Sequence, residues 1–200
     1  MRVAAVILAA GASTRFGSPK VLARLEGRTL LEHVLDAVRE AGIDEIVVVL
    51  GHAADEVEEG IDWLDERLVR NPDPELLSSS LQVGLAAAAD LEPPVRAAVV
   101  LLGDQPRVRP EVIHGLLAAA RGSDEPVVIP DYAEGGGANP VVVRRDGFDL
   151  ADEASGDRGL GPLLAGQEDL VLRVPFSGSN PDVDTQADLD ALADGPSRSP

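Results

Sequence analysis

The stretch VAAVILAAGASTRFGSPK, from Val3 to Lys20, decides the fold. Residues Val3 to Ala10 form an unbroken apolar run that ends at Gly11, and such a run predicts a strand that is buried on both faces. Strands with both faces buried are typical of parallel sheets, in which helices cover the two sides. We therefore expect a parallel sheet that has Val3 to Ala10 as a core strand.

Further strand and helix patterns alternate along the chain. Ala97 to Leu102 is the strongest strand, and Thr29 to Ala41 is a helix in which Thr29 and Glu32 match a capping box and Gly42 a helix stop. Alternation of this kind implies crossover connections, so the expected fold is a three-layer α/β/α Rossmann-like domain with a mostly parallel, mixed central sheet. The other expected strands are Ile46–Leu50, Leu68–Asn71, Val127–Ile129, Pro140–Val143 and Leu170–Val174, and the other expected helices are Ser78–Ala89, Pro110–Arg121, Gly159–Ala165 and Gln186–Ala193.

Length and charge limit the functions that this chain can have. Its 200 residues fit one domain, which we place at residues 1–193 with a flexible tail at 194–200. The net charge of −18 argues against nucleic acid or an anionic membrane as a partner, because both would repel the protein. There is no Cys, and no apolar stretch approaches the roughly 20 residues that cross a bilayer. Residues 1–12 resemble a short signal peptide, but their removal would delete the predicted core strand, so we expect a cytoplasmic protein.

The loop after the first strand has the composition of a phosphate site. Glycines let backbone N–H groups approach a bound anion closely, and Lys20 follows Gly11 and Gly17. Lys20 is the only lysine of a chain whose other basic residues are all arginine. Residues 11–31 hold four basic side chains and one acidic one, a local charge of +3 in an acidic protein. The spacing fits neither the dinucleotide fingerprint nor the P-loop, so an ordinary glycine-rich turn is the alternative interpretation.

Asp104 and Asp184 are the candidate metal ligands. Asp104 follows the strand Ala97 to Leu102 at its carboxyl end, where ligands of parallel sheets bind. Mg²⁺ prefers oxygen ligands and usually takes only one or two of them from the protein. The alternative roles are an Asx turn for Asp104 and a helix cap for Asp184 or Thr185. If the loop of Asp184 returns beside Asp104, either Asp184 or its neighbour Asp182 can be the second ligand.

A run of three serines, Ser78 to Ser80, opens the expected helix Ser78–Ala89. Hydroxyl groups and unpaired N–H groups at a helix N-terminus can recognise the edge of a nucleotide base. The alternative is an ordinary N-terminal cap with spare hydroxyls.

Six segments, taken in order, resemble the nucleotidyltransferase superfamily, which activates small phosphorylated compounds with a nucleoside triphosphate. They extend over nearly the whole chain, and the first of them together with Asp104 is specific for the superfamily. The closest resemblance is to the molybdenum cofactor cytidylyltransferases, because of the GDQP form, the serine run, the GDRG segment, and LAAG at Leu8 to Gly11 where the related guanylyl branch has LAGG. The segments are LAAGASTRFGSPK, SSSLQVGL, LLGDQP, ANPVVV, SGDRGLGPLL and DVDTQADL.

The resemblance implies transfer of CMP from CTP to the terminal phosphate of a molybdopterin-type acceptor, with Mg²⁺ held by Asp104 and Asp184. Arg15 and Lys20 would hold the triphosphate and, with Asp104, carry the catalysis. The expected partners are CTP, a small phosphorylated acceptor and, transiently, a molybdoenzyme or its chaperone. The nucleoside would contact Leu8, Ala9, Ala10, Gly11, Ser79 and Ser80, and the acceptor would lie near Asn139, Pro140, Asp157, Arg158 and Gly159.

Two departures from the family pattern weaken the prediction of the acceptor more than that of the fold or the type of reaction. Relatives commonly have Gly-His-Pro where this chain has Ala138-Asn139-Pro140, and they have proline where it has Gln186. Two alternatives therefore stay open. One is a nucleotidyltransferase for a sugar phosphate or another small phosphorylated acceptor, and the other is a noncatalytic nucleotide-binding protein.

Overall fold

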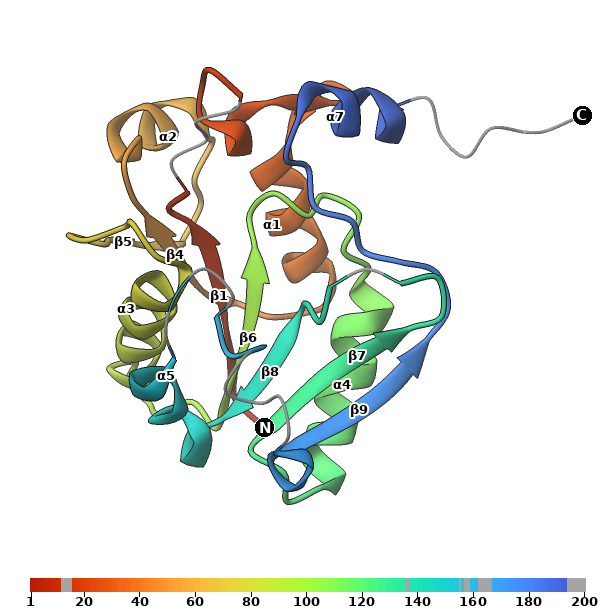
Figure 1. Cartoon of the computed structure of the whole chain (residues 1–200). Coiled ribbons are helices and arrows are strands. Elements are labelled where there is room, and N and C mark those ends of the chain that lie inside the picture. The colour runs from red at the N-terminus through yellow and green to blue at the C-terminus, as the bar shows by residue number, and fades with distance from the viewer. Residues whose placement is uncertain (12–15, 136, 155, 157–158, 162–166, 194–200) are drawn as a thin grey trace, which may run out of the picture.

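A seven-stranded mixed sheet forms the centre of the protein in the computed structural model (Figure 1). The structure describes residues 1–11, 16–135, 137–154, 156, 159–161 and 167–193. All neighbouring strands are parallel except β8, which is antiparallel to both β6 and β7, so the expected fold class is confirmed. In sheet order the strands are β5 (Arg67–Arg70), β4 (Glu45–Leu50), β1 (Val3–Ala9), β6 (Ala97–Leu102), β8 (Val141–Arg144), β7 (Val127–Tyr132) and β9 (Val171–Phe176).

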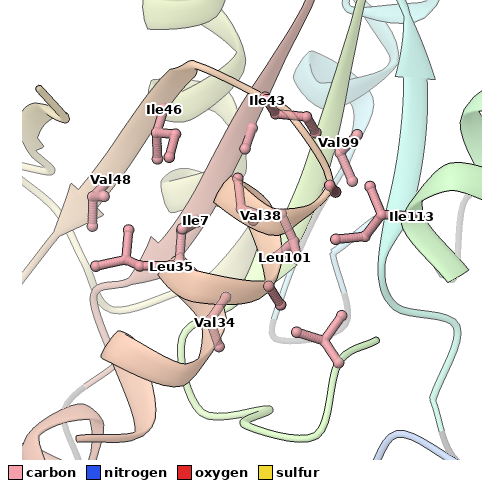
Figure 2. Close-up of a cluster of buried hydrophobic side chains, with 14 of the residues drawn as sticks. Ile7, Val34, Leu35, Val38, Ile43, Ile46, Val48, Val99, Leu101 and Ile113 are labelled. Carbon is pink, nitrogen blue, oxygen red and sulfur yellow. The ribbon is translucent and has the colours of Figure 1, made fainter. Parts of the chain in front are cut away.

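Helices cover both faces of this sheet. Successive residues of β1 point to opposite sides: Ile7 packs in the cluster that includes α1 (Leu30–Glu40) and α4 (Pro110–Gly122), whereas Val6 packs in the cluster that includes α3 (Leu77–Ala89). Figure 2 shows the first cluster, in which side chains of α1 lie over those of the sheet. The unbroken apolar run of β1 thus reflects burial on both faces, as the sequence predicts.

The predicted capping box of α1 is confirmed. The hydroxyl oxygen of Thr29 accepts a hydrogen bond from the Glu32 backbone N–H at 3.1 Å, and a Glu32 carboxylate oxygen accepts one from the Thr29 backbone N–H at 2.7 Å. The helix is followed by Gly42, whose φ of +69° is a conformation that favours glycine. Local sequence therefore fixes both ends of the helix that covers β1.

Helix α3 comes very close to the sheet at Gly84. A Cβ atom placed there would lie 2.4 Å from Cγ1 of Val6 and 3.0 Å from Cγ2 of Val49. Since real Cβ atoms do not approach other carbons so closely, only glycine permits this distance between helix and sheet.

A small subdomain, of which the sequence patterns predict only the helix Gln186–Ala193, closes one end of the molecule. The hairpin β2 (Arg24–Leu25) and β3 (Arg28–Thr29) lies against α7 (Gln186–Ala193), and a separate apolar cluster joins Leu25 and Leu30 to Val183 and Leu189. This contact brings the C-terminal part of the chain beside the loop that follows β1 (Figure 1).

Several short helices complete the described part of the chain. They are α2 (Ala54–Gly60), α5 (Leu150–Glu153) and the 3₁₀ turns η1 (Lys20–Leu22), η2 (Arg145–Gly147) and η4 (Glu168–Leu170). Most of the helix expected at Gly159–Ala165, and the tail at 194–200, lie outside the described residues. Of the described helices, none combines the length and the apolar character needed to cross a bilayer.

Candidate active site

A cavity of about 360 Å³ lies at the carboxyl ends of β1 and β6, where ligands of parallel sheets bind. Five backbone segments far apart in sequence meet here: the end of β1 with the loop after it, the loop after β4 at His52, the start of α3, the turn after β6, and the segment before α7. The predicted residues that line this cavity are Leu8, Ala9, Ala10, Gly11, Lys20, Ser80, Asp104 and Asp184, and Asp182 also lines it. Arg15 lies outside the described residues.

Lys20 joins the two predicted metal ligands. Its ammonium group, at the start of η1, forms an ion pair with Asp104 and lies 2.9 Å from Oδ1 of Asp184. Burial alone would lower the pKa of Lys20, but the neighbouring carboxylates of Asp104 and Asp184 outweigh burial and raise the pKa above its ordinary value. Lys20 is therefore positively charged throughout the physiological pH range, and the returning loop does place Asp184 beside Asp104.

The two carboxylates have the chemistry of a cation site. Oδ1 of Asp104 is buried and has no hydrogen-bond partner among the described residues, so one oxygen of this carboxylate is available to a ligand. The ammonium group of Lys20 already lies between Asp104 and Asp184, so this position attracts positive charge. Within the described residues no group of three His, Cys, Asp or Glu side chains is arranged to hold a metal. Two carboxylates suffice for Mg²⁺, which takes most of its other ligands from phosphates and water.

Asp182 has a different environment from Asp184. Burial raises the pKa of Asp182, a hydrogen bond of 2.5 Å from Nε2 of Gln105 opposes this shift, and the charges of Asp104 and Asp184 add to it. Asp184 is the one of these two carboxylates that Lys20 contacts directly, and Lys20 also pairs with Asp104. The expected helix cap at this point is Thr185, whose hydroxyl accepts a hydrogen bond from the backbone N–H of Asp188 at 3.3 Å.

The serine run lies inside the first turn of α3 and does not cap it. The N-cap position is Leu76, which provides no side-chain hydrogen bond, so the predicted capping role of the serines is wrong. Ser80 lines the cavity and Ser79 does not, and Nδ2 of Asn71 donates to Oγ of both Ser79 and Ser80 at 3.1 Å. Asn71 directly follows β5, and the rule that ligands gather at the carboxyl ends of strands could have singled it out.

A second cavity of about 470 Å³ adjoins the first. The two share Leu8, Leu77, Leu102 and Asp182 as a common wall. Of the predicted acceptor residues, Asn139 and Gly159 line this second cavity, Pro140 is buried before β8 and does not line it, and Asp157 and Arg158 lie outside the described residues. The other walls are mostly aliphatic, and Arg173 is the one basic side chain among the described residues that line it.

The match to known proteins agrees with this geometry. Residues 5–171 match the family model described as the MobA-like NTP transferase domain. The chain belongs to this family. Both the predicted phosphate loop and Asp104 fall within the residues that match the MobA-like family, whereas Asp182 and Asp184 follow them.

Solved structures similar to this MobA-like domain cover nearly all of it. Rv0371c from Mycobacterium tuberculosis H37Rv is 31% identical, with a TM-score of 0.85 over 97% of this chain and 98% of that chain. A homologue of Rv0371c from Mycobacterium sp. strain JC1 is 35% identical, with a TM-score of 0.82 over 96% of each chain. Rv0371c has also been solved as a complex with manganese.

Curated relatives of the MobA-like domain are longer proteins. The bifunctional protein GlmU of Azorhizobium caulinodans is 39% identical over 120 residues, which are 56% of this chain and 25% of GlmU. The chain thus spans about a quarter to a third of the length of the curated relatives that it matches.

Proposed function

We propose that the protein is a nucleotidyltransferase that moves CMP from CTP to the terminal phosphate of a molybdopterin-type acceptor and releases pyrophosphate. The observation that carries this proposal is the contact of Lys20 with both Asp104 and Asp184 beside the backbone of the loop after β1. This arrangement offers a fixed cation and a pair of carboxylates to a metal-bound triphosphate. The MobA-like family and the GDQP and LAAG sequences support the reaction and the choice of CTP.

The reaction needs charge compensation more than a strong nucleophile. A phosphate oxygen of the acceptor attacks the α-phosphorus, the bond between that phosphorus and the bridging oxygen of the β-phosphate breaks, and pyrophosphate leaves. No general base is required, because the attacking oxygen is already ionised. Lys20 and the loop amides would stabilise the negative charge of the leaving pyrophosphate.

Asp104 and Asp184 are the residues that would hold Mg²⁺. When bound, the metal would neutralise charge on the α-phosphate. The carboxylate oxygens suit a hard cation, and the buried Oδ1 of Asp104, which has no hydrogen-bond partner in the described part of the chain, is the donor that is best placed for it. The manganese complex of Rv0371c supports the use of a divalent metal by this fold.

The acceptor would occupy the second cavity. Its aliphatic walls can pack against the faces of a flat ring, whose polar edge atoms would need partners such as Asn139 and Asp182. Arg173 is available there for a negatively charged group. We further propose, from the resemblance to molybdenum cofactor cytidylyltransferases, that the protein works in the cytoplasm and passes its product to a molybdoenzyme or its chaperone.

The test is a pyrophosphate-release assay that combines CTP, GTP, ATP and UTP in turn with molybdopterin and with a panel of sugar phosphates. We expect release with CTP and molybdopterin in the presence of Mg²⁺. Release with a sugar phosphate alone would replace the proposed acceptor. Binding of a nucleotide without release under any combination would show a noncatalytic nucleotide-binding protein.

A further inference from the structure

Two buried amide side chains connect the cation site to the second cavity. Gln105 and Asn180 are each only 2% exposed. Nε2 of Gln105 donates a hydrogen bond to Oδ1 of Asp182 at 2.5 Å, and Oε1 of Gln105 accepts one from Nδ2 of Asn180 at 3.0 Å. Nδ2 of Asn180 also donates to the backbone carbonyl oxygen of Asn139 at 3.3 Å. We call Gln105 and Asn180 together the amide bridge.

The two ends of the amide bridge are walls of the two cavities. Asp182 lines both cavities, and Asn139 lines the second one. The carbonyl oxygen of Asn139 accepts a further hydrogen bond from the Tyr132 hydroxyl at 3.1 Å. Gln105 directly follows Asp104, whose carbonyl oxygen accepts a hydrogen bond from the Val183 backbone N–H at 3.0 Å. The bridge therefore links the turn that carries the cation site to the loop before β8.

Packing alone does not account for this choice of residues. Burying uncharged amides costs free energy unless every polar atom is paired, and Oδ1 of Asn180 is buried without a hydrogen-bond partner among the described residues. An aliphatic pair of similar size would avoid that cost. An aliphatic pair could not form the hydrogen bonds that hold the Asp182 carboxylate and the Asn139 carbonyl oxygen in fixed positions.

We propose that Gln105 and Asn180 are positioning residues that set the place of the acceptor relative to the nucleotide phosphates. The amide bridge holds Asp182 on the shared wall and fixes Asn139 on the far wall of the second cavity. This inference rests on the proposed function, because it takes the second cavity as the acceptor site. Neither residue touches the reacting phosphates; each acts through Asp182 or Asn139.

The test reverses the hydrogen bond between positions 105 and 182. Gln105→Glu places a second carboxylate against Asp182, so the two groups repel each other, although the hydrogen bond from Asn180 can persist. In the Asp182→Asn background the same Gln105→Glu change faces an amide that can donate to it, and the connection is restored with its direction reversed. The two variants and their combination form a double-mutant cycle.

We expect Gln105→Glu to lower kcat/KM for the acceptor when residue 182 is Asp, and to change it much less when residue 182 is Asn. Gln105→Glu in the native background should lower kcat/KM for the acceptor by about ten- to hundredfold, the usual range for a lost hydrogen bond to a charged group, and leave KM for the nucleotide within about twofold. In the Asp182→Asn background it should change kcat/KM for the acceptor by less than about threefold. Equal losses in the two backgrounds, or parallel increases of both KM values, would overturn the proposal.

A matched glutamine provides the structural control. Nε2 of Gln82, on α3, donates to the backbone carbonyl of Ala151 at 3.0 Å, and Gln82 does not line either cavity. Gln82→Glu should leave kcat/KM for the acceptor unchanged. A loss for Gln82→Glu as large as that for Gln105→Glu would mean that the effect is only structural.

A measurement without substrate separates this inference from the proposed function. The backbone amide NMR signals of Gly137 and Asn139 should shift in Gln105→Glu and return toward the positions of the Asp182→Asn protein in the double variant. If no acceptor supports pyrophosphate release, the proposed function fails, while these shifts still decide whether the bridge holds the Asn139 loop. Signals that stay unmoved in Gln105→Glu would overturn the bridge itself.

Discussion

Nζ of Lys20 lies 2.9 Å from Oδ1 of Asp184, although 164 positions of sequence separate the two residues. The contact depends on the third apolar cluster, in which Leu25 and Leu30 pack against Val183 and Leu189. The segment before α7 is thereby held over the loop that follows β1. The first cavity is complete only because two distant parts of the chain are packed together.

Asp104→Ala is expected to reduce turnover by at least about 10²- to 10³-fold, since it removes the carboxylate with the unpaired buried oxygen from the proposed metal site. Thermal unfolding should stay cooperative. Steady-state pyrophosphate release across a Mg²⁺ titration measures the effect. Asp62, which is exposed and follows α2, is the control, and Asp62→Ala should behave as the parent. Parental turnover by Asp104→Ala would remove the metal assignment.

Lys20→Met should reduce turnover by roughly 10²-fold or more, because it takes the only lysine away from the proposed triphosphate site. Lys20→Arg should restore only part of this loss, since a planar guanidinium does not reproduce a compact ammonium between two carboxylates. The two variants are compared by kcat and by KM for the nucleotide. Full activity of Lys20→Arg would show that charge alone matters at this position.

Gly84→Ala should destabilise the protein by about 1–3 kcal/mol, because the new methyl group overlaps Val6 and pushes α3 away from β1. Urea unfolding followed by circular dichroism gives the change in free energy. At Gly122 in α4, an added Cβ atom would meet no neighbouring atom within 4 Å. Gly122→Ala is therefore expected to cause no loss, and equal losses at both positions would contradict the close packing of α3.

Tyr132, the only tyrosine, should ionise at a higher pH than an ordinary tyrosine. Burial raises its pKa from 10.0 to about 12, and the charge of Arg109 opposes this shift only in part. Between these values the unfolded chain releases the phenol proton while the folded protein keeps it, so stability should fall as the pH rises through this range. Tyrosinate absorbance reports the ionisation in one step.

The denatured chain is the reference for this titration and should ionise near 10.0. A folded-state step at the same pH as the denatured chain would show that the Tyr132 hydroxyl is not buried. In Tyr132→Phe the fall in stability across the range should be smaller.

Local patterns predicted the parts of the fold that depend on near neighbours in sequence. The apolar run of β1 and the Thr29–Glu32 capping box each depend on only a few neighbouring residues, and both predictions are confirmed. The position of Asp104 at a strand end followed from the same rule. Sequence patterns did not predict the β2–β3 hairpin, since its strands of two residues each have no readable period.

The contacts of the site were harder to predict because they join distant segments. Nothing near Asn180 shows that its amide meets Gln105, which lies 75 positions earlier. Whether Asp182 or Asp184 contacts Lys20 depends in the same way on how the segment before α7 packs in space. The alternative role of the serines as a cap of α3 was wrong because Leu76 is the N-cap, and Asn71, which lies outside the helix, donates hydrogen bonds to both Ser79 and Ser80.

The wall shared by the two cavities has a practical consequence for inhibition. Leu8, Leu77, Leu102 and Asp182 contact whatever fills either space. A single compound that tethers a nucleoside to an acceptor-like ring through a diphosphate would span both spaces and displace two ligands at once. Such a bisubstrate compound should bind more tightly than either half, because joining the halves avoids the second loss of translational freedom.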